Sequence, residues 1–343
     1  MDLSIIVPVY NVEEYIRPCI KSIFRQGLDD NCFEVIIVND GTEDRSIEVI
    51  KDIIAQHQNV TVLNQENQGL SVARNNGIAI AKGKYILMPD SDDLLIENSL
   101  KPLLEKAIEY EADLVVADFL RMTNEEINNL QVIPQEDLST QEKTGEQLFL
   151  EDLNPYHCYV WRTLYRRSFL LETNLKFYPG IRYQDVPFTH ECYLKAGKCL
   201  RTNQLLIIYR KRSGSATYSF NVGKARDFST AIGKTWELIS LDGISSAVKE
   251  KIRSDMWESF SEMLRLTFRY IKKNKERVKV IEYIRENAHD LDFKNGMKQR
   301  LTTFLLRRMP HTFICLRYYY KLIIEDRFLP FYYHRLRRPS TKI

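Results

Sequence analysis

The chain has 343 residues, of which 44% are apolar and 28% are charged, and its 49 Lys and Arg against 46 Asp and Glu give a formal net charge of +3. This composition is typical of a globular protein with one main domain and an annex, and it excludes a small disulfide-stabilised scaffold. The six cysteines form no CxxC pair, which favours free thiols in a reducing compartment. The sequence shows no signal-type N-terminus and no run of 18 apolar residues, so neither secretion nor a membrane-spanning helix is expected.

Short apolar runs alternate with amphipathic segments over roughly the first 90 residues. Each run has the length of a strand and no polar face, which is typical of strands buried on both faces of a parallel sheet. These predicted strands are Leu3–Tyr10, Phe33–Val38, Val60–Leu63 and Tyr85–Met88, and helical spacing of apolar residues is found at 15–27, 47–54 and 71–81. The alternation predicts right-handed βαβ units and therefore an α/β fold with a mostly parallel sheet flanked by helices.

The rest of the chain is predicted to complete this domain and then to become helical. Residues 113–119 and 205–209 are expected to be strands, and the polar stretch 121–142 is expected to be a surface loop. Beyond about residue 222 the apolar spacing is helical only, with one long helix indicated from Val248 to Ile271. The chain is therefore expected to contain an α/β domain followed by a helical C-terminal extension.

Polar clusters directly follow each of the first four predicted strands. They are Tyr10–Asn11, Asn39–Gly41, Asn67–Gly69 and Asp90–Asp93. Because ligands bind beyond the carboxyl ends of parallel strands, these clusters should converge on one crevice. The carboxylates of Asp90, Asp92 and Asp93 repel one another unless a positive group lies among them, which favours a bound divalent cation. A helix N-cap with acids in its first turn is the structural alternative.

The crevice has side chains suited to a nucleotide. No GxGxxG or GxxxxGK[ST] motif is present, so neither a dinucleotide fingerprint nor a P-loop is expected. Asp40 can accept a hydrogen bond from the imide N–H of a pyrimidine, and Asn11 and Arg74 can contact base and phosphate. Asp92 can hold a hard cation against a diphosphate. A nucleotide diphosphate leaving group is the simplest interpretation.

Four motifs resemble those of the family 2 glycosyltransferases of the GT-A fold. They are SIIVPVYN, IIVNDGTEDRS, NQGLSVARNNG and YILMPDSDDLL, and they occur in this order in about the first third of the chain. The later segments VWRTLYRRSFL, GIRYQDVPF and YRKRSGSAT resemble the acceptor half of bacterial members that build polysaccharides. The resemblance implies a Rossmann-like GT-A domain with a nucleotide-sugar-binding half at residues 1–120 and an acceptor-binding half at 121–222. Residues 223–343 would form the helical C-terminal region.

The resemblance also implies a reaction. A family member of this type is a hexosyltransferase that moves a sugar, with inversion, from a nucleotide diphosphate sugar such as a UDP-sugar. The acceptor would be a saccharide or a polyprenyl-linked oligosaccharide in the synthesis of a cell-surface polysaccharide such as a capsule or O-antigen, and the cofactor would be Mn²⁺ or Mg²⁺. The donor sugar, the linkage and the choice of metal are not encoded in the motifs.

Individual residues acquire roles from the same resemblance. Asp185 occupies the place of the general base that takes a proton from the acceptor hydroxyl, and Asp92 that of the metal ligand. Trp161 and Tyr165 are candidates for stacking on an acceptor sugar, with packing in the core as the alternative. The nucleotide sugar is expected to contact Pro8, Tyr10, Asn11, Glu13, Asp40, Asn67, Gly69, Arg74, Asp90, Ser91, Arg210 and Ser215.

One position departs from the family pattern, because Gln184 stands where Glu commonly precedes the catalytic Asp. Losing this acidic neighbour removes a like charge that would raise the pKa of Asp185, which is compatible with activity. Two other functions stay open. One is a sugar-nucleotide-binding subunit without transfer activity, and the other is a nucleotidyltransferase, although the Gly-rich basic loop typical of the latter is absent.

The C-terminal segment is strongly basic. From Arg300 onward it has ten Lys and Arg against two acids, interspersed with Phe and Tyr. This mixture favours attachment to an anionic membrane surface over a nucleic-acid partner, which we do not expect. We therefore predict a cytoplasmic protein that is peripheral on the inner face of the cell membrane; a homo-oligomer stays open.

Overall fold

The computed structural model describes residues 1–130, 133, 137–212, 219–287, 304 and 312. The strands within them are β1 (Leu3–Val9), β2 (Phe33–Asp40), β3 (Val60–Gln65), β4 (Tyr85–Leu87), β5 (Leu94–Leu95), β6 (Leu114–Thr123), β7 (Thr140–Lys143), β8 (Thr163–Arg166) and β9 (Cys199–Lys211). The helices are α1 (Ile16–Ile23), α2 (Lys51–Gln56), α3 (Leu70–Ile80), α4 (Leu100–Tyr110), α5 (Asn124–Asn128), α6 (Gly145–Glu151), α7 (Arg167–Glu172), α8 (Asp185–Lys195), α9 (Val222–Glu237), α10 (Ser246–Tyr270) and α11 (Asn274–Asn287).

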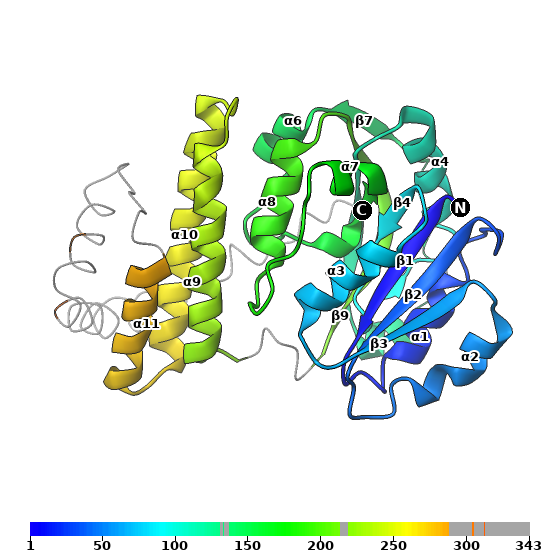
Figure 1. Ribbon diagram of the computed structural model, residues 1–343, viewed down its shortest axis with the longest axis horizontal. Coiled ribbons are helices and arrows are strands. Elements are labelled where there is room, and N and C mark those ends of the chain that lie inside the picture. Colours follow the sequence, from blue (N-terminus) through cyan, green and yellow to red (C-terminus); the bar gives the residue numbers. More distant parts are fainter. Residues whose placement is uncertain (131–132, 134–136, 213–218, 288–303, 305–311, 313–343) are drawn as a thin grey trace.

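The strands form one sheet in the order β3-β2-β1-β4-β8-β6-β9-β5, with β7 paired to β9 (Figure 1). β1 pairs in parallel with β2 and β4, and β2 pairs in parallel with β3, as the βαβ pattern predicts. In the second half β6 and β9 are also parallel, while β8 runs antiparallel between β4 and β6. The expected α/β architecture is therefore confirmed, and the carboxyl ends of β1 to β4 share one edge.

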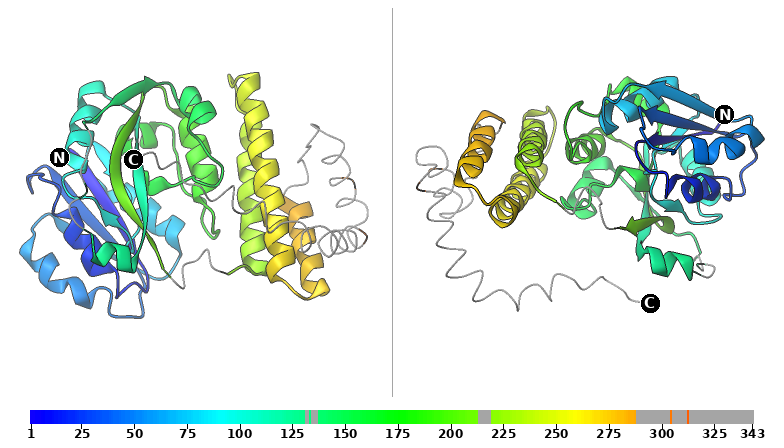
Figure 2. Two further views of the ribbon diagram at one scale, coloured as in Figure 1. Left: turned by 180° about the vertical axis from the view of Figure 1, so that it is seen from behind. Right: turned by 90° about the horizontal axis from the view of Figure 1, so that it is seen from below.

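Helices cover both faces of the sheet because the strands are apolar on both. In β1, Leu3, Ile5 and Val7 pack with α1 and α4, whereas Ile6 packs with α3 on the opposite face. Gly77 of α3 is required there, since an added Cβ atom would clash with the side chain of Ile6. The sheet is thus the middle layer between two helical layers (Figure 2).

The predicted surface loop at 121–142 is partly wrong. Strand β6 continues to Thr123, helix α5 follows directly, and β7 begins at Thr140. The side chain of Thr123 accepts from the backbone N–H of Glu126, and the carboxylate of Glu126 accepts from the backbone N–H of Thr123. This capping box is a sequence signal for a helix start that the low apolar content of the segment conceals.

Three helices, α9, α10 and α11, pack together beside α8 (Figures 1 and 2). Their shared core includes Phe228 of α9 and Met256 and Phe260 of α10, all of which are buried. The expected helical C-terminal region is present in this part of the described chain. No helix within the described residues combines the length and the apolar content that a membrane span requires.

Candidate active site

The loops after β1 and β2 are joined by hydrogen bonds. The backbone N–H of Asn11 donates to Oγ1 of Thr42 at 2.8 Å, and Oδ1 of Asn11 accepts from the backbone N–H of Glu43 at 3.0 Å. Gly41 has φ 67°, and a Cβ atom at this position would lie 2.9 Å from the backbone nitrogen of Asn67. The loop after β3 therefore reaches the same place, so three of the predicted clusters do lie together.

The predicted donor-contacting residues of β1 and its loop differ in exposure. Pro8 is buried within β1, so it supports the strand, whereas 43% of Tyr10 is exposed. Glu13 is exposed, and its Oε2 atom accepts from the backbone N–H of Arg45 at 2.9 Å. Tyr10 and Glu13 thus lie where a ligand at this edge can contact them.

Asp40 connects β2 to the start of α3. Its carboxylate accepts hydrogen bonds from Nε2 of Gln65 at 2.7 Å and from the backbone N–H groups of Gln68 and Gly69 at 2.8 and 2.9 Å. Gly69 is the N-cap residue of α3 and has φ 85°, a conformation that favours glycine. Asp40 is buried and Asn67 is exposed, so the cluster presents both a fixed carboxylate and an accessible amide.

Arg74 of α3 contacts both the loop after β4 and the segment at Phe177. It is buried, its Nη2 donates to Oδ1 of Asp90 at 2.6 Å, and its guanidinium lies 5.3 Å from the centroid of the Phe177 ring. The neighbouring Asn75 exchanges two hydrogen bonds with the backbone of Phe177. Burial raises the pKa of Asp90, and the positive charge of Arg74 opposes that rise.

The three acids after β4 form a compact cluster. Carboxylate oxygens of Asp90, Asp92 and Asp93 all lie within 4.8 Å of one another. Oδ1 of Asp93 accepts from the backbone N–H of Arg210 at 2.8 Å, while Nε of Arg210 donates to the backbone oxygen of Asp92 at 2.8 Å. Arg212, which the sequence analysis did not single out, donates from Nε to Oδ2 of Asp92 at 2.7 Å.

These acids fit a divalent cation. Oδ2 of Asp93 is buried and has no hydrogen-bond partner among the described residues, and several carboxylate oxygens at close range are the ligands that Mg²⁺ and Mn²⁺ prefer. Burial and the charges of Asp90 and Asp92 raise the pKa of Asp93 well above its usual value. The interpretation of Asp93 as the cap of the next helix is wrong, because α4 begins only at Leu100.

Asp185 is the first residue of α8, and the charges of Arg74 and Asp90 act on its carboxyl group. Burial raises the pKa of Asp185 to about 6; the charge of Arg74 and backbone hydrogen bonds lower it, and the charge of Asp90 raises it. Arg74 therefore influences both Asp90 and Asp185, which the sequence places far apart. The preceding Gln184 is buried, and its Oε1 has no partner among the described residues.

The loop that leads into α8 is held by α9. Tyr183 has φ 60°, an unfavourable conformation for an aromatic residue, and its ring stacks on Phe228 with centroids 4.4 Å apart. Nη1 of Arg182 lies 3.3 Å from Oδ2 of the buried Asp227. The helical C-terminal region therefore contacts the segment that positions Asp185.

The two aromatic residues predicted to contact an acceptor are buried. Tyr165 is 1% exposed, and its hydroxyl donates to the backbone oxygen of Val160, so its ring offers no surface to a sugar. Trp161 is 3% exposed, and its ring packs against those of Tyr159 and Tyr209, with centroids 4.7 and 5.8 Å away. The core-packing alternative describes both residues, because the strand-length apolar context of this segment places them inside. Ser91 is buried as well, and Ser215 lies outside the described residues.

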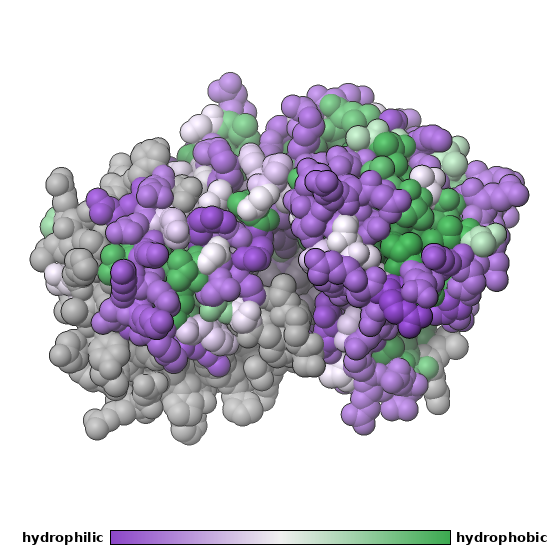
Figure 3. Space-filling view, turned by 60° about the horizontal axis from the view of Figure 1, so that its bottom comes forward, coloured by the Kyte–Doolittle hydropathy of each residue, from purple (hydrophilic) through white to green (hydrophobic). Residues whose placement is uncertain are grey.

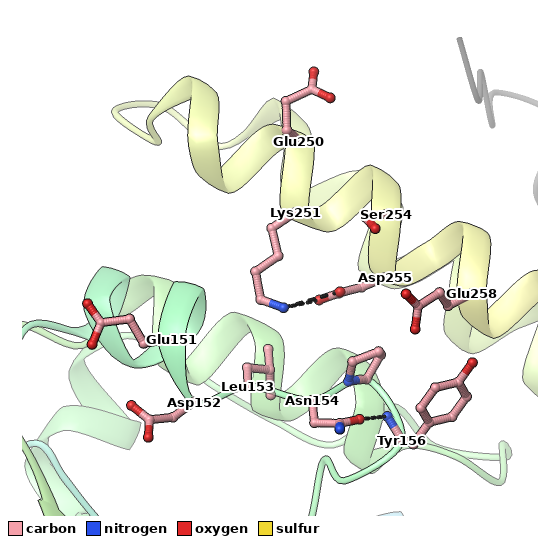
Figure 4. A pocket seen from close by; sticks show the side chains of 11 residues that line it. Glu151, Asp152, Leu153, Asn154, Tyr156, Glu250, Lys251, Ser254, Asp255 and Glu258 are labelled. Carbon is pink, nitrogen blue, oxygen red and sulfur yellow. Dashed lines mark hydrogen bonds and ion pairs between the residues drawn. The ribbon is translucent and has the colours of Figure 1, made fainter. Parts of the chain in front are cut away.

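A second hollow lies apart from these residues. A cavity of about 750 Å³ separates the segment 151–156 from α10, and five acids line it together with Lys251 (Figure 4). Lys251 pairs with Asp255 at 3.0 Å, and Asp255 lies 3.7 Å from Nε2 of the buried His190 of α8. None of the predicted site residues lines this cavity. Beside it, the pair of His190 and Asp255 is a polar contact between α8 and the helical region.

Comparisons with known proteins point to one family. The sequence model described as Glycosyl transferase family 2 matches residues 4–172. Glycosyltransferase GlyG of Streptococcus pneumoniae is 30% identical over 258 residues, which are 72% of this chain and 83% of GlyG. The chain belongs to glycosyltransferase family 2. The uncharacterized glycosyltransferase EpsJ of Bacillus subtilis is 38% identical over 219 residues, which are 63% of this chain and only 62% of EpsJ.

Solved structures share the fold. The crystal structure of S. aureus TarS 1–349 in complex with UDP-GlcNAc has a TM-score of 0.71 and 22% identity, and the match covers 90% of this chain and 87% of that chain. The mannosyltransferase PcManGT from Pyrobaculum calidifontis, in complex with GDP-Man and Mn²⁺, has a TM-score of 0.53 and 12% identity, with 94% and 87% covered. At these identities the likeness shows the GT-A fold, which the sequence motifs predict.

Proposed function

We propose that this protein transfers a sugar from a UDP-sugar, with inversion and with the help of a divalent cation, to a saccharide or lipid-linked oligosaccharide in polysaccharide synthesis. The observation that carries the proposal is the position of Arg74, which pairs with Asp90 on the donor side and acts electrostatically on Asp185. Family membership, the UDP-GlcNAc bound by TarS and the Mn²⁺ bound by PcManGT support it.

The residues of the chain divide the work between donor and acceptor. Asp40 and Asn11 hold the loops against which the base of the nucleotide binds, and Arg74, Arg210 and Arg212 supply positive charge near the diphosphate. Asp185, with its pKa near 6, accepts the proton of the acceptor hydroxyl as that oxygen bonds to the anomeric carbon from the face opposite the diphosphate. The bond to the diphosphate breaks at the same time, and its electron pair leaves with the nucleotide.

A cation would be held by Asp92, with Asp90 and Asp93 as neighbours, and it would stabilise the negative charge that develops on the diphosphate. Arg212, which is 21% exposed and paired with Asp92, would have to share this carboxylate with the cation. The acids thus supply the ligand oxygens and the arginines keep the local charge from becoming strongly negative.

A panel of donors tests the proposed transfer. The protein should release UDP from at least one of UDP-glucose, UDP-galactose or UDP-GlcNAc, and release should rise when a crude lipid-linked acceptor fraction is added. It should fall to background with EDTA and recover with excess Mn²⁺. Tight binding of UDP and Mn²⁺ by calorimetry without turnover of any donor would instead favour the non-catalytic binding subunit, for which the buried Gln184 at the usual Glu position is the argument.

We also propose that the protein is peripheral on an anionic membrane through residues 300–343. Only residues 304 and 312 of this segment are described, so the support is its sequence: ten basic residues against two acids, each base contributing about 1 kcal/mol near an anionic surface. The full chain should co-sediment with phosphatidylglycerol vesicles in low salt, and a chain truncated after Lys298 should not. Equal co-sedimentation of both chains would contradict this attachment.

A further inference from the structure

Two arginines share one acid beside the loop that precedes α8, and a lysine lies near one of them. Oδ2 of Asp227 accepts from Nη1 of Arg182 at 3.3 Å, and Oδ1 accepts from Nε and Nη2 of Arg226 at 3.2 and 3.1 Å. Lys224, one turn before, donates to the backbone and side-chain oxygens of Ser219 at 2.8 Å. Burial, and to a smaller extent the charge of Arg182, lower the pKa of Lys224.

Arg182 and Arg226 share one acid, and both are about half exposed. Arg17, by contrast, forms a bidentate pair with Asp52. Here two guanidinium groups share one carboxylate, and the side chains of Arg182 and Arg226 are 55% and 54% exposed while that of Asp227 is 5% exposed. Each guanidinium carries five N–H donors, so most of them face solvent.

Further acids lie near this cluster. The nearby ring of Tyr183 is influenced by Glu262 as well as by Asp185 and Asp227, and these charges add to the effect of burial, which raises the pKa of Tyr183 to about 12. Glu262 is itself paired with Arg265. Asp185 is the acid among them that belongs to the candidate site.

The cluster lies on the acceptor side of the candidate site. Arg182 is three residues before Asp185, and Tyr183 between them stacks on Phe228 of α9. The donor-side arginines belong to other elements, since Arg74 is in α3 and Arg210 is in β9. The space-filling view shows the surface hollowed between the α/β part and the helical part (Figure 3), and α8 contacts α9. A group bound by Arg182 and Arg226 would therefore adjoin the proposed base.

We propose that Arg182 and Arg226 bind a phosphate group of the acceptor and so place its attacking hydroxyl beside Asp185. This inference rests on the proposed function and specifies its acceptor as a phosphorylated molecule. Pairs of N–H donors on a guanidinium group match the geometry of phosphate oxygens. Because each arginine uses only some of its donors on Asp227, the others can bind a phosphate while the ion pairs to Asp227 persist. Lys224 adds positive charge at the rim of the same site.

Binding of a matched pair of small molecules tests the inference without turnover. The protein is first saturated with UDP and diamagnetic Mg²⁺ so that the donor site is filled, and glycerol 3-phosphate or glycerol is then titrated by NMR. Glycerol 3-phosphate should bind and glycerol should not. The double variant Arg182→Gln, Arg226→Gln should weaken glycerol 3-phosphate about tenfold or more, since hydrogen bonds to charged groups are lost.

The control variant is Lys106→Gln, Arg253→Gln, which also removes two positive charges. Both of its side chains pair with acids on their own helices, α4 and α10, rather than with Asp227. It should bind glycerol 3-phosphate as the native protein does. Equal weakening in both double variants, or none in either, would overturn the inference. Arg182→Lys, Arg226→Lys should recover part of the affinity by restoring charge without the forks.

Geranyl diphosphate in detergent, compared with geraniol, distinguishes the source of the phosphate. Stronger binding of geranyl diphosphate than of glycerol 3-phosphate, lost in the Gln variant, would identify a lipid-linked phosphate. The reverse order would identify a phosphate within a soluble or polymeric acceptor. Failure of UDP itself to bind would contradict the proposed function, whereas UDP binding without a preference for phosphorylated ligands would contradict only this inference.

Discussion

The Asp185→Asn variant is expected to lose sugar transfer by roughly 10²- to 10⁴-fold, the range of a lost general base, while its affinity for UDP stays unchanged. Asn has the shape of Asp but cannot accept the proton of the acceptor hydroxyl at neutral pH. Asp185 lies at the start of α8 rather than among the residues that follow β1 to β4, so the nucleotide contacts should survive. Transfer rates and UDP calorimetry on the same preparation would measure both effects.

The pH dependence provides an independent check of this role. Because burial raises the pKa of Asp185 to about 6, the carboxylate is deprotonated above that pH and protonated below it. Since a base acts only when deprotonated, kcat/KM should fall about tenfold per pH unit below pH 6 in the native protein. The residual activity of Asp185→Asn should lack this step.

Stability separates a lost base from a damaged fold. A carboxyl group whose pKa is higher in the folded than in the unfolded state stabilises the folded protein at low pH. This contribution is lost as the pH rises from the pKa of the unfolded state to that of the folded state. Asp185 is such a group, so Asp185→Asn should be at least as stable as the native protein at pH 8. If Asp185→Asn lost UDP affinity as much as it lost transfer, or if its fold were less stable, Asp185 would be a structural residue and not the base.

Much of the fold follows from local pattern. The runs that become β1 to β4 are apolar on both faces, which is typical of strands covered by helices on both sides of an α/β sheet. Their alternation with helices predicts the parallel pairing that is found. The antiparallel insertion of β8 between β4 and β6 could not be predicted, because short strands such as Thr163–Arg166 have no period that distinguishes their partner. Helix α5 was missed because its start depends on the cap at Thr123 and not on apolar spacing.

The candidate site shows a similar division. Clusters that directly follow strands can be predicted to converge, because topology alone places them on one edge. The pairing of Asp92 with Arg212 requires β5 and β9 to run side by side, and the link from Arg74 to Asp185 requires the loop at Phe177 to dock on α3. Neither contact has a local signature. The burial of Tyr165 has the same cause, since composition does not reveal which face of a strand is covered.

The Asp92→Asn variant is expected to lose the metal-dependent part of donor binding. In the native protein Mn²⁺ should tighten UDP binding, because the cation bridges carboxylate and diphosphate charges. Asn retains one neutral ligand oxygen but removes the negative charge, so the gain from Mn²⁺ should fall by at least roughly 10- to 100-fold, the effect of changing even the residues that orient metal ligands. Calorimetry with UDP, in Mn²⁺ and in EDTA, measures this difference directly.

Arg212→Gln separates the two partners of this carboxylate. It removes the ion pair at 2.7 Å but leaves Asp92 charged, so the gain in UDP affinity on adding Mn²⁺ should persist or increase. Affinity measured in EDTA should instead fall, since a positive charge near the diphosphate is lost. If both variants lost affinity equally with and without Mn²⁺, Asp92 would be a structural partner of Arg212. Asp92→Asn and Arg212→Gln break the same ion pair. If a cation binds this cluster, the first should reduce the gain in UDP affinity from Mn²⁺ and the second should not.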